Sequence, residues 1–239
     1  MKLNRKVTAE QEEFLDLEEL MKELTLAEEK EEALGRDILL FTEITREVAS
    51  NVVAFIREVN EVDDLREKEN PNYVRQPITL FIDTYGGEVS AGFSMITAIK
   101  QSRTKVIGVV TGNCYSMGVP LFVSCHERHT TSFATYMLHS VSVESIEGRS
   151  ITDYKNKISS VELHQEAMRK FLRNELPDVD PQYFDNILDA DKDSFFLADE
   201  AVELGIAQYN DYELLKYIPT SELGEKNPKT NRKWKAKGH

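Results

Sequence analysis

The sequence predicts an α/β fold in which buried parallel strands alternate with helices. Residues 78–82 (ITLFI) and 106–110 (VIGVV) are apolar runs without polar alternation, typical of parallel strands covered on both faces. A stretch with helical apolar spacing lies between them, at residues 89–101. Strands joined in this way by helices form right-handed crossovers in one sheet, so the repetition indicates an α/β domain.

The other elements follow in chain order. Residues 38–41 (ILLF) suit a short buried strand, and residues 48–59 have helical periodicity. The charged stretch 63–72 carries Pro71 and is expected to be an exposed loop. Further predicted elements are a short apolar helix at 116–123, a strand at 133–139 and a long amphipathic helix at 151–176.

Two segments of opposite charge flank the predicted domain. Residues 1–36 form an acidic N-terminal arm with leucines at roughly helical spacing, and we expect this arm to be helical. Residues 224–239 form a basic tail without apolar periodicity, which we expect to be disordered. Because the charges of the two segments cancel, the net charge of −13 resides in the domain at 37–223.

Composition excludes several classes of protein. The chain has 29 Lys and Arg against 42 Asp and Glu, and this acidity argues against a nucleic-acid partner. No stretch reaches the roughly 18 apolar residues of a membrane helix, so no membrane association is expected. The two cysteines form no C-x-x-C pair, which fits a reducing compartment. We therefore predict a cytoplasmic protein.

A glycine-rich turn is the first candidate for chemistry. Residues 83–92 (DTYGGEVSAG) lie between a predicted buried strand and a predicted helix. Gly86 and Gly87 can take positive φ and let backbone N–H groups approach a ligand closely. Such donors near a helix N-terminus suit an oxyanion, although a tight strand-to-helix turn also requires glycine.

Ser116 and His139 are the other candidates. Ser116 lies at a second strand-to-helix turn, where a sharp bend would present its hydroxyl group. The segment departs from the G-x-S-x-G pattern because Cys114 precedes the serine by two residues, and an N-cap serine is the alternative. His139 ends an apolar strand, where a histidine is either structural or catalytic.

A run of metal-binding residue types occurs at 125–129 (CHERH). A structural zinc site needs about four ligands, usually in two separated pairs. The sequence offers no second pair, so we predict a polar turn here and no metal.

Taken together, these segments resemble the proteolytic subunit of the ATP-dependent Clp protease, ClpP. The family patterns N-S-P-G-G-x-V-x-A-G, G-x-A-x-S-M-G/A, M-I-H-Q-P and D-R-D-N-F-x-x-x-E-A occur in the family's order. Four ordered segments are far more specific than any one of them, and the resemblance spans residues 37–208. The corresponding segments are residues 83–92, 112–118, 137–141 and 191–201.

The resemblance implies a ClpP/crotonase-like β/α superhelix with a protruding helix-strand handle, and a peptidase domain at 37–223. It implies Ser116 as nucleophile, His139 as base and Asp193 as the third member of the triad. The backbone N–H groups of Gly87 and Met117 would form the oxyanion hole. The family forms stacked heptameric rings with the sites inside. It needs no cofactor, and ATP is used only by a separate Clp-type AAA+ ATPase partner.

Several residues depart from the family patterns. Asp83 and Tyr85 replace asparagine and proline, and Tyr115 puts a bulky ring beside the nucleophile, which would narrow the specificity pocket. The glycine-rich strand after His139 becomes residues 142–149, with a single glycine. The acidic arm replaces the family's axial-loop sequence. Divergence of this kind suits a phage- or mobile-element-encoded relative.

The sequence therefore predicts a Clp-type serine endopeptidase that cleaves peptides or unfolded polypeptides inside a homo-oligomeric barrel. One alternative is a non-catalytic ring or scaffold subunit. A second is a phage-type maturation protease of the same fold. A third is a crotonase-type acyl-CoA enzyme, a class that does not require the set Ser116, His139 and Asp193.

Overall fold

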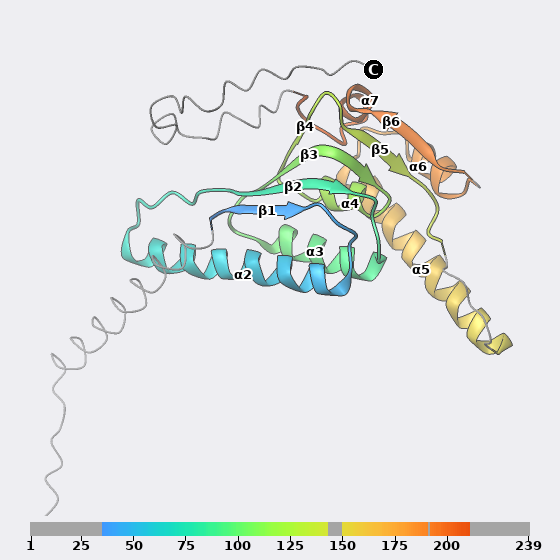
Figure 1. The fold of residues 1–239 in the computed structure, drawn as a ribbon, viewed down its shortest axis with the longest axis horizontal. Helices are drawn as coiled ribbons and strands as arrows, with labels where there is room; N and C mark the ends of the chain where they lie inside the picture. The colour runs from blue at the N-terminus through green and yellow to red at the C-terminus, as the bar shows by residue number, and fades with distance from the viewer. Residues whose placement is uncertain (1–34, 143–149, 191, 211–239) are drawn as a thin grey trace, which may run out of the picture.

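A computed structural model describes residues 35–142, 150–190 and 192–210 (Figure 1). The predicted helix of the acidic arm, the predicted basic tail, and the end of the predicted domain from residue 211 to 223 lie outside the described residues. Asp191 and residues 143–149 lie outside them as well.

Strands and helices alternate along most of the described chain. This alternation confirms the predicted α/β class. In chain order the elements are β1 (Asp37–Leu40), α2 (Arg46–Glu69), β2 (Ile78–Thr84), α3 (Val89–Gln101), β3 (Val106–Tyr115), α4 (Gly118–Val123), β4 (Glu127–Thr130), β5 (Thr135–Leu138), α5 (Ile151–Glu175), α6 (Pro181–Leu188), β6 (Ser194–Leu197) and α7 (Ala198–Glu203).

Five strands follow one another in the order β1-β2-β3-β5-β6, and β4 completes the six-stranded sheet by pairing with β3. Pairing is parallel except between β5 and β6, which are antiparallel. The long strand β3 is shared, because its first half pairs with β4 and its last three residues pair with β5. The sheet therefore brings the ends of β3 and β5 together, and β6 lies beside β5.

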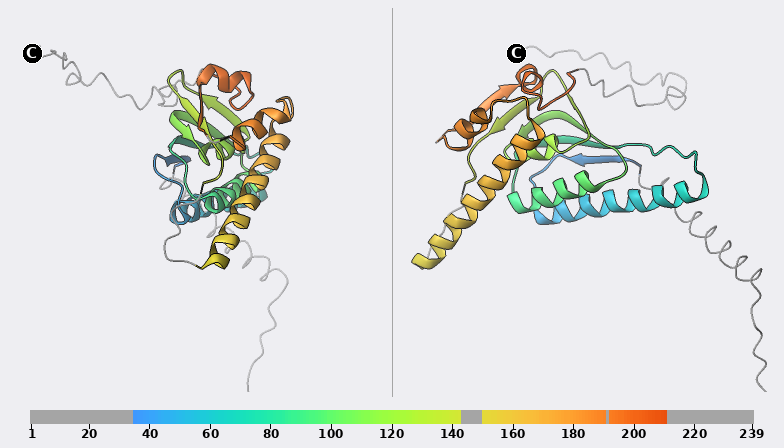
Figure 2. Two further views of the ribbon diagram at one scale, coloured as in Figure 1. Left: turned by 90° about the vertical axis from the view of Figure 1, so that its right-hand side faces the viewer. Right: turned by 180° about the vertical axis from the view of Figure 1, so that it is seen from behind.

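Helices α2 and α3 lie side by side along one face of the sheet (Figures 1 and 2). The side chains of β2 that point to this face, Ile78, Leu80 and Ile82, are fully buried. They meet apolar residues of the two helices, including Ile56 and Met95, and burial of such side chains is the main favourable contribution to folding.

Helix α5 projects away from the sheet and forms the helix of the predicted handle (Figure 1). It begins at a capping box, in which the Ser150 hydroxyl accepts from the Asp153 N–H and the Asp153 carboxylate accepts from the Ser150 N–H. Residues 151–160 are exposed, whereas Met168 and Leu172 anchor the other end in the core. Within the described residues, no helix is long and apolar enough to cross a membrane.

The predicted loop at 63–72 is largely wrong, because α2 continues to Glu69. Its charged side chains form ion pairs with residues outside the helix. Asp63 is fully buried and accepts two hydrogen bonds from Arg36, at 2.7 and 3.1 Å. Arg75 binds two further carboxylates of the same helix. Charged residues that look like a loop therefore continue the helix, with Asp63 buried and with Asp64 and Glu67 partly exposed against Arg75.

The predicted polar turn at 125–129 is also wrong, since Glu127–Thr130 is strand β4. The strand forms because β3 offers it a free edge and because its polar side chains find partners. His129 Nε2 lies 2.6 Å from Glu127 Oε1, and the His126 Nδ1 atom accepts from the Val106 N–H at 3.0 Å. Strand β3 is longer than the predicted 106–110, and helix α4 begins at Gly118 rather than at Ser116.

Candidate active site

Ser116 lies in a sharp bend between β3 and α4. Its φ is +52°, and it is the only non-glycine residue with positive φ in the part of the chain that the structure describes. A left-handed conformation costs a non-glycine residue about 1–2 kcal/mol, so its surroundings must hold it in place. One restraint is the Ser116 N–H group, which donates to the Met137 carbonyl oxygen of β5 at 2.8 Å.

The glycine turn packs directly against this bend. Gly86 has φ of +98°, and a Cβ atom added there would lie 2.7 Å from Ser116 Cβ and 2.8 Å from the Tyr115 carbonyl oxygen. Gly87 has φ of +144°, and a Cβ there would lie 2.3 Å from the Ile44 carbonyl oxygen. Both positions therefore require glycine, for conformation and for space.

Two backbone donors beside Ser116 are free. Within the described residues, the N–H groups of Gly87 and Met117 have no hydrogen-bond acceptor, whereas the neighbouring Gly86 N–H donates to Thr84 Oγ1 at 3.1 Å. The Met117 nitrogen lies 3.1 Å from the Cβ position of Gly86, so the two turns present their donors to the same region. Free N–H groups arranged in this way can stabilise an oxyanion.

His139 reaches Ser116 through the pairing of β3 with β5. Tyr115 pairs with Met137, so the residues that follow both strands leave the sheet at the same edge. The His139 Nε2 atom lies 2.7 Å from Ser116 Oγ, within hydrogen-bond distance. A neutral imidazole in this position can remove the hydroxyl proton during attack on a carbonyl group.

Asp193 lies on the other side of the imidazole ring. Leu138 pairs with Ser194, so the antiparallel register sets His139 opposite Asp193. The Asp193 Oδ1 atom is 3.8 Å from His139 Nδ1, too far for a hydrogen bond, and its side chain is 50% exposed. The structure thus brings all three predicted side chains together, with a direct contact only between Ser116 and His139.

Neither a reactive thiol nor a metal-binding group accompanies these three side chains in the described part of the chain. Cys114 and Cys125 are buried, and burial raises the pKa of the Cys125 thiol to about 12 and that of Cys114 well above its usual value. Neither thiol is therefore a nucleophile at neutral pH. Across the described residues there is no group of three or more His, Cys, Asp or Glu side chains that could hold a metal ion.

A polar chain beside the site was not predicted from the sequence. Asn113 and Thr135 link Asp83 to the Tyr115 hydroxyl group by hydrogen bonds across three strands. The signal in the sequence is weak, because both residues look like ordinary polar positions at the ends of apolar strands.

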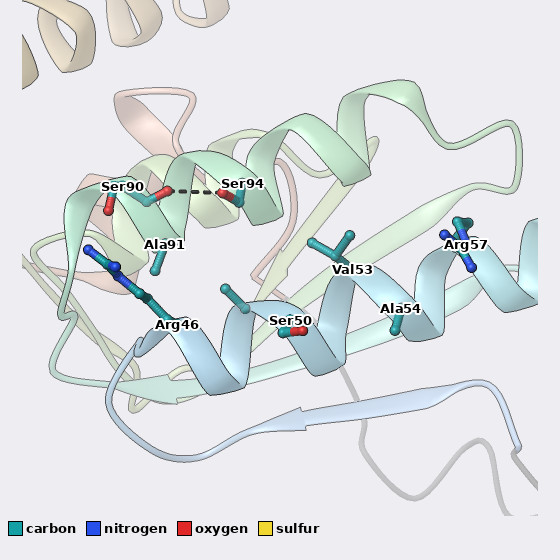
Figure 3. Close-up of a pocket in the computed structure, with 9 residues that line it drawn as sticks. Arg46, Ser50, Val53, Ala54, Arg57, Ser90, Ala91 and Ser94 are labelled. Carbon is teal, nitrogen blue, oxygen red and sulfur yellow. Dashed lines mark hydrogen bonds between the residues drawn. The ribbon is translucent and has the colours of Figure 1, made fainter.

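A groove of about 500 Å³ lies between α2 and α3 (Figure 3). Arg46 and Arg57 stand at its two ends, and small side chains such as Ser50, Ala54 and Ala91 line it. It contains none of the predicted site residues.

The fold is that of the ClpP-like α/β class. The chain belongs to the Clp protease family, whose model matches residues 27–209. This assignment confirms the resemblance seen in the sequence, in a divergent member of the family.

The chain is similar to several known Clp proteins. It is 26% identical over 181 residues to the ATP-dependent Clp protease proteolytic subunit 3 of Parasynechococcus marenigrum (strain WH8102), covering 72% of this chain and 82% of that protein. It is 24% identical over 147 residues to proteolytic subunit 2 of Borreliella burgdorferi, covering 61% and 64%. A solved structure of a ClpP1 mutant from Listeria monocytogenes matches with a TM-score of 0.60 at 20% identity, covering 75% of this chain and 92% of that one. This structural match confirms the ClpP-like fold.

Proposed function

We propose that the protein is a serine endopeptidase of the Clp type that cleaves peptides or unfolded polypeptides through an acyl-enzyme. The observation that carries this proposal is the 2.7 Å approach of His139 Nε2 to Ser116 Oγ, at a strained bend flanked by free N–H groups. The serine thus has both a base and potential oxyanion donors.

The reaction follows from these positions. His139 Nε2 takes the hydroxyl proton as Ser116 Oγ attacks the peptide carbonyl carbon, and the N–H groups of Gly87 and Met117 bind the resulting oxyanion. The C–N bond then breaks, and the imidazolium gives its proton to the leaving amine. Water attacks the ester with His139 again as base, which releases the acid product and restores Ser116. No step requires a cofactor.

Asp193 is proposed as the residue that orients the imidazole. A carboxylate near Nδ1 favours the tautomer that carries its proton there and leaves Nε2 free to accept the serine proton. The separation of 3.8 Å would have to shorten as substrate binds or as subunits assemble, since contacts of this kind often tighten in the reacting complex.

We also propose that the chain acts as a homo-oligomer. Leu39 of the edge strand β1 and Phe41, which follows this strand, are exposed, while the groove of Figure 3 is lined largely by small side chains on the helices. In this proposal the exposed edge of one copy meets the groove of the next. Contacts between two different surfaces generate a ring when the rotation between copies closes. Stacked heptameric rings, a Clp-type AAA+ ATPase that delivers unfolded chains, and a cytoplasmic location are proposed from the family, and the names of the relatives above refer to ATP-dependent proteases.

The test combines native mass spectrometry with fluorophosphonate labelling of the full chain. We expect an oligomer that is labelled at Ser116, loss of the label in Ser116→Ala, and an unchanged label in Ser132→Ala, which removes an exposed hydroxyl on the loop before β5. An assembled, folded protein without label would contradict the proposal and favour the non-catalytic ring subunit. A labelled protein that cleaves only one capsid-type substrate would favour a maturation protease.

A further inference from the structure

Three aromatic rings form a row beside Ser116. The aromatic row consists of Tyr85, which precedes the glycine turn, Tyr115, which precedes the nucleophile, and Phe195 of β6. The ring centroids of Tyr85 and Tyr115 are 5.6 Å apart, and those of Tyr115 and Phe195 are 5.8 Å apart, both with edge-to-face geometry. Pairs at this distance and angle attract one another, so the three rings form one unit.

The aromatic row is open to solvent. Tyr85 is 73% exposed and Phe195 is 63% exposed, whereas Tyr115 between them is half-buried. Neighbouring exposed aromatic rings are unusual on a soluble surface and mark a place where a ligand or partner binds. The row also adjoins the proposed catalytic residues, because Tyr115 precedes Ser116 in the chain, and Tyr115 and Phe195 both pair with Met137, two residues before His139.

A chain of hydrogen bonds holds the central ring. The Thr135 hydroxyl donates to Asn113 Oδ1 at 3.0 Å, and Asn113 donates to Asp83 Oδ1 from its side chain at 3.2 Å and from its backbone at 2.8 Å. Since the Thr135 proton is used in this way, the Tyr115 hydroxyl donates to Thr135 Oγ1, at 3.0 Å. Every donor thus points toward the Asp83 carboxylate, an order in which the bonds strengthen one another.

The backbone makes room for this chain. A Cβ atom at Gly112 would lie 2.6 Å from Asp83 Cγ, so glycine there lets the carboxylate approach β3. Asp83 and Tyr115 are both departures from the family patterns, and the structure shows that they lie at the two ends of one hydrogen-bonded chain.

We propose, on the basis of the function proposed above, that the aromatic row recognises a large aromatic side chain of a polypeptide substrate next to the scissile bond. Tyr115 is the specificity-determining residue, and Tyr85 and Phe195 complete the contact surface. Asp83, Asn113 and Thr135 are positioning residues that act through the orientation of the Tyr115 ring.

The test compares two peptidyl phosphonate probes that differ only in carrying Phe or Ala beside the reactive phosphorus. The readout is the ratio of their second-order labelling rates, which normalises any general loss of reactivity. For the wild type we expect a ratio of about 10–200 in favour of Phe, as for apolar groups in a fitted site. Tyr115→Ala should bring the ratio to within about threefold of one, because the aromatic contacts that favour the Phe probe are then lost.

Two further variants remove exposed rings and leave the core intact. Tyr85→Ala and Phe195→Ala should each lower the ratio by about 2–12-fold, the worth of one aromatic contact. Phe133→Ala is the matched control, because Phe133 is 94% exposed and is not part of the aromatic row. This control should keep the wild-type ratio.

The positioning residues are tested at Thr135. Thr135→Val keeps the shape but removes the hydroxyl group, and should lower the ratio by about 2–12-fold, the usual effect of one hydrogen bond. Thr135→Ser keeps the hydroxyl group and should restore the ratio. A residue with only a structural role would change stability without changing the ratio between the two probes.

The inference is overturned if fluorophosphonate labels Ser116 but the wild type labels equally fast with both probes. It is also overturned if the Tyr85 and Phe195 variants keep the wild-type ratio, which decides the case even if Tyr115→Ala does not fold. Variants that dissociate in native mass spectrometry with an unchanged ratio would assign the aromatic row to a contact between copies of the chain. A wild type that no probe labels refutes the proposed function and the inference together.

Discussion

The Oδ1 atom of Asp193 faces the Nδ1 atom of His139 at 3.8 Å, on the side of the imidazole ring opposite Ser116. The pairing of Leu138 with Ser194 sets this relationship, since the next residue outward on each strand is His139 or Asp193. The Asp193 carboxylate therefore lies beside the imidazole ring without forming a hydrogen bond to it.

Asp193→Asn tests this placement. An amide can donate to Nδ1 and so favour the wrong tautomer, and we expect kcat to fall by about 10⁴-fold while Ser116 and His139 stay in contact. Peptide hydrolysis and the rate of fluorophosphonate labelling would measure the loss. Asp178→Asn changes an exposed carboxylate elsewhere and should have no effect. A wild-type rate in Asp193→Asn would mean that another group orients the imidazole.

Gly87→Ala should abolish the site by displacing the glycine turn. Its Cβ would lie 2.3 Å from the Ile44 carbonyl oxygen at a φ of +144°, so overpacking and backbone strain together should cost about 3 kcal/mol or more of unfolding free energy. Gly35→Ala is the matched control, because Gly35 also has positive φ but has nothing within 4 Å of the added Cβ. Strain alone should cost this control about 1–2 kcal/mol in urea denaturation. Equal losses in both variants would contradict the packing argument.

Asp63→Asn should be among the most destabilising polar substitutions in the domain. Asp63 is fully buried and accepts from Arg36, Thr104 and Tyr73. Removing its charge breaks the buried ion pair with Arg36, and breaking such a pair typically costs about 3–5 kcal/mol. Urea denaturation would measure this, with Glu61→Gln as control, since the exposed pair of Glu61 with Arg57 contributes only about 0.3–0.5 kcal/mol. A loss below that of the control would show that the ion pair is dispensable.

The carboxylates at the same end of α2 should make the folded protein less stable in acid. The Arg75 hydrogen bond lowers the pKa of Glu67 from 4.5 to about 2. Burial raises the pKa of Asp63, but hydrogen bonds from Arg36, Thr104 and Tyr73 outweigh it and lower the pKa overall. A carboxylate with a lowered folded-state pKa stabilises the fold above its unfolded pKa and loses this contribution as pH falls. We therefore expect the free energy of unfolding to decrease between pH 4.5 and about 2.

Denaturation midpoints measured across this range would check the expectation. Glu67→Gln should reduce the slope of stability against pH, because this side chain no longer titrates. A slope that is the same in wild type and Glu67→Gln would contradict the assignment.

The local features of the site could be predicted from the sequence. The position of Ser116 after an apolar strand, the paired glycines before a helix, and His139 at a strand end are all local patterns. The distances between them could not be predicted, because they depend on which strands pair and in which register. The aromatic row was missed for the same reason, since its rings come from three segments that only the sheet brings together.

By itself, the sequence determined the α/β alternation, the two strand-to-helix turns and the membership in the Clp protease family, since each depends only on the kind and order of residues along the chain. Only the tertiary structure decided the extent of α2 and the existence of β4. Their charged side chains resemble loop residues until distant partners, such as Arg36 for Asp63 and the edge of β3 for β4, satisfy them. The physical reason is that charge and hydrogen-bonding capacity are local properties, whereas the partners that satisfy them are provided by the fold.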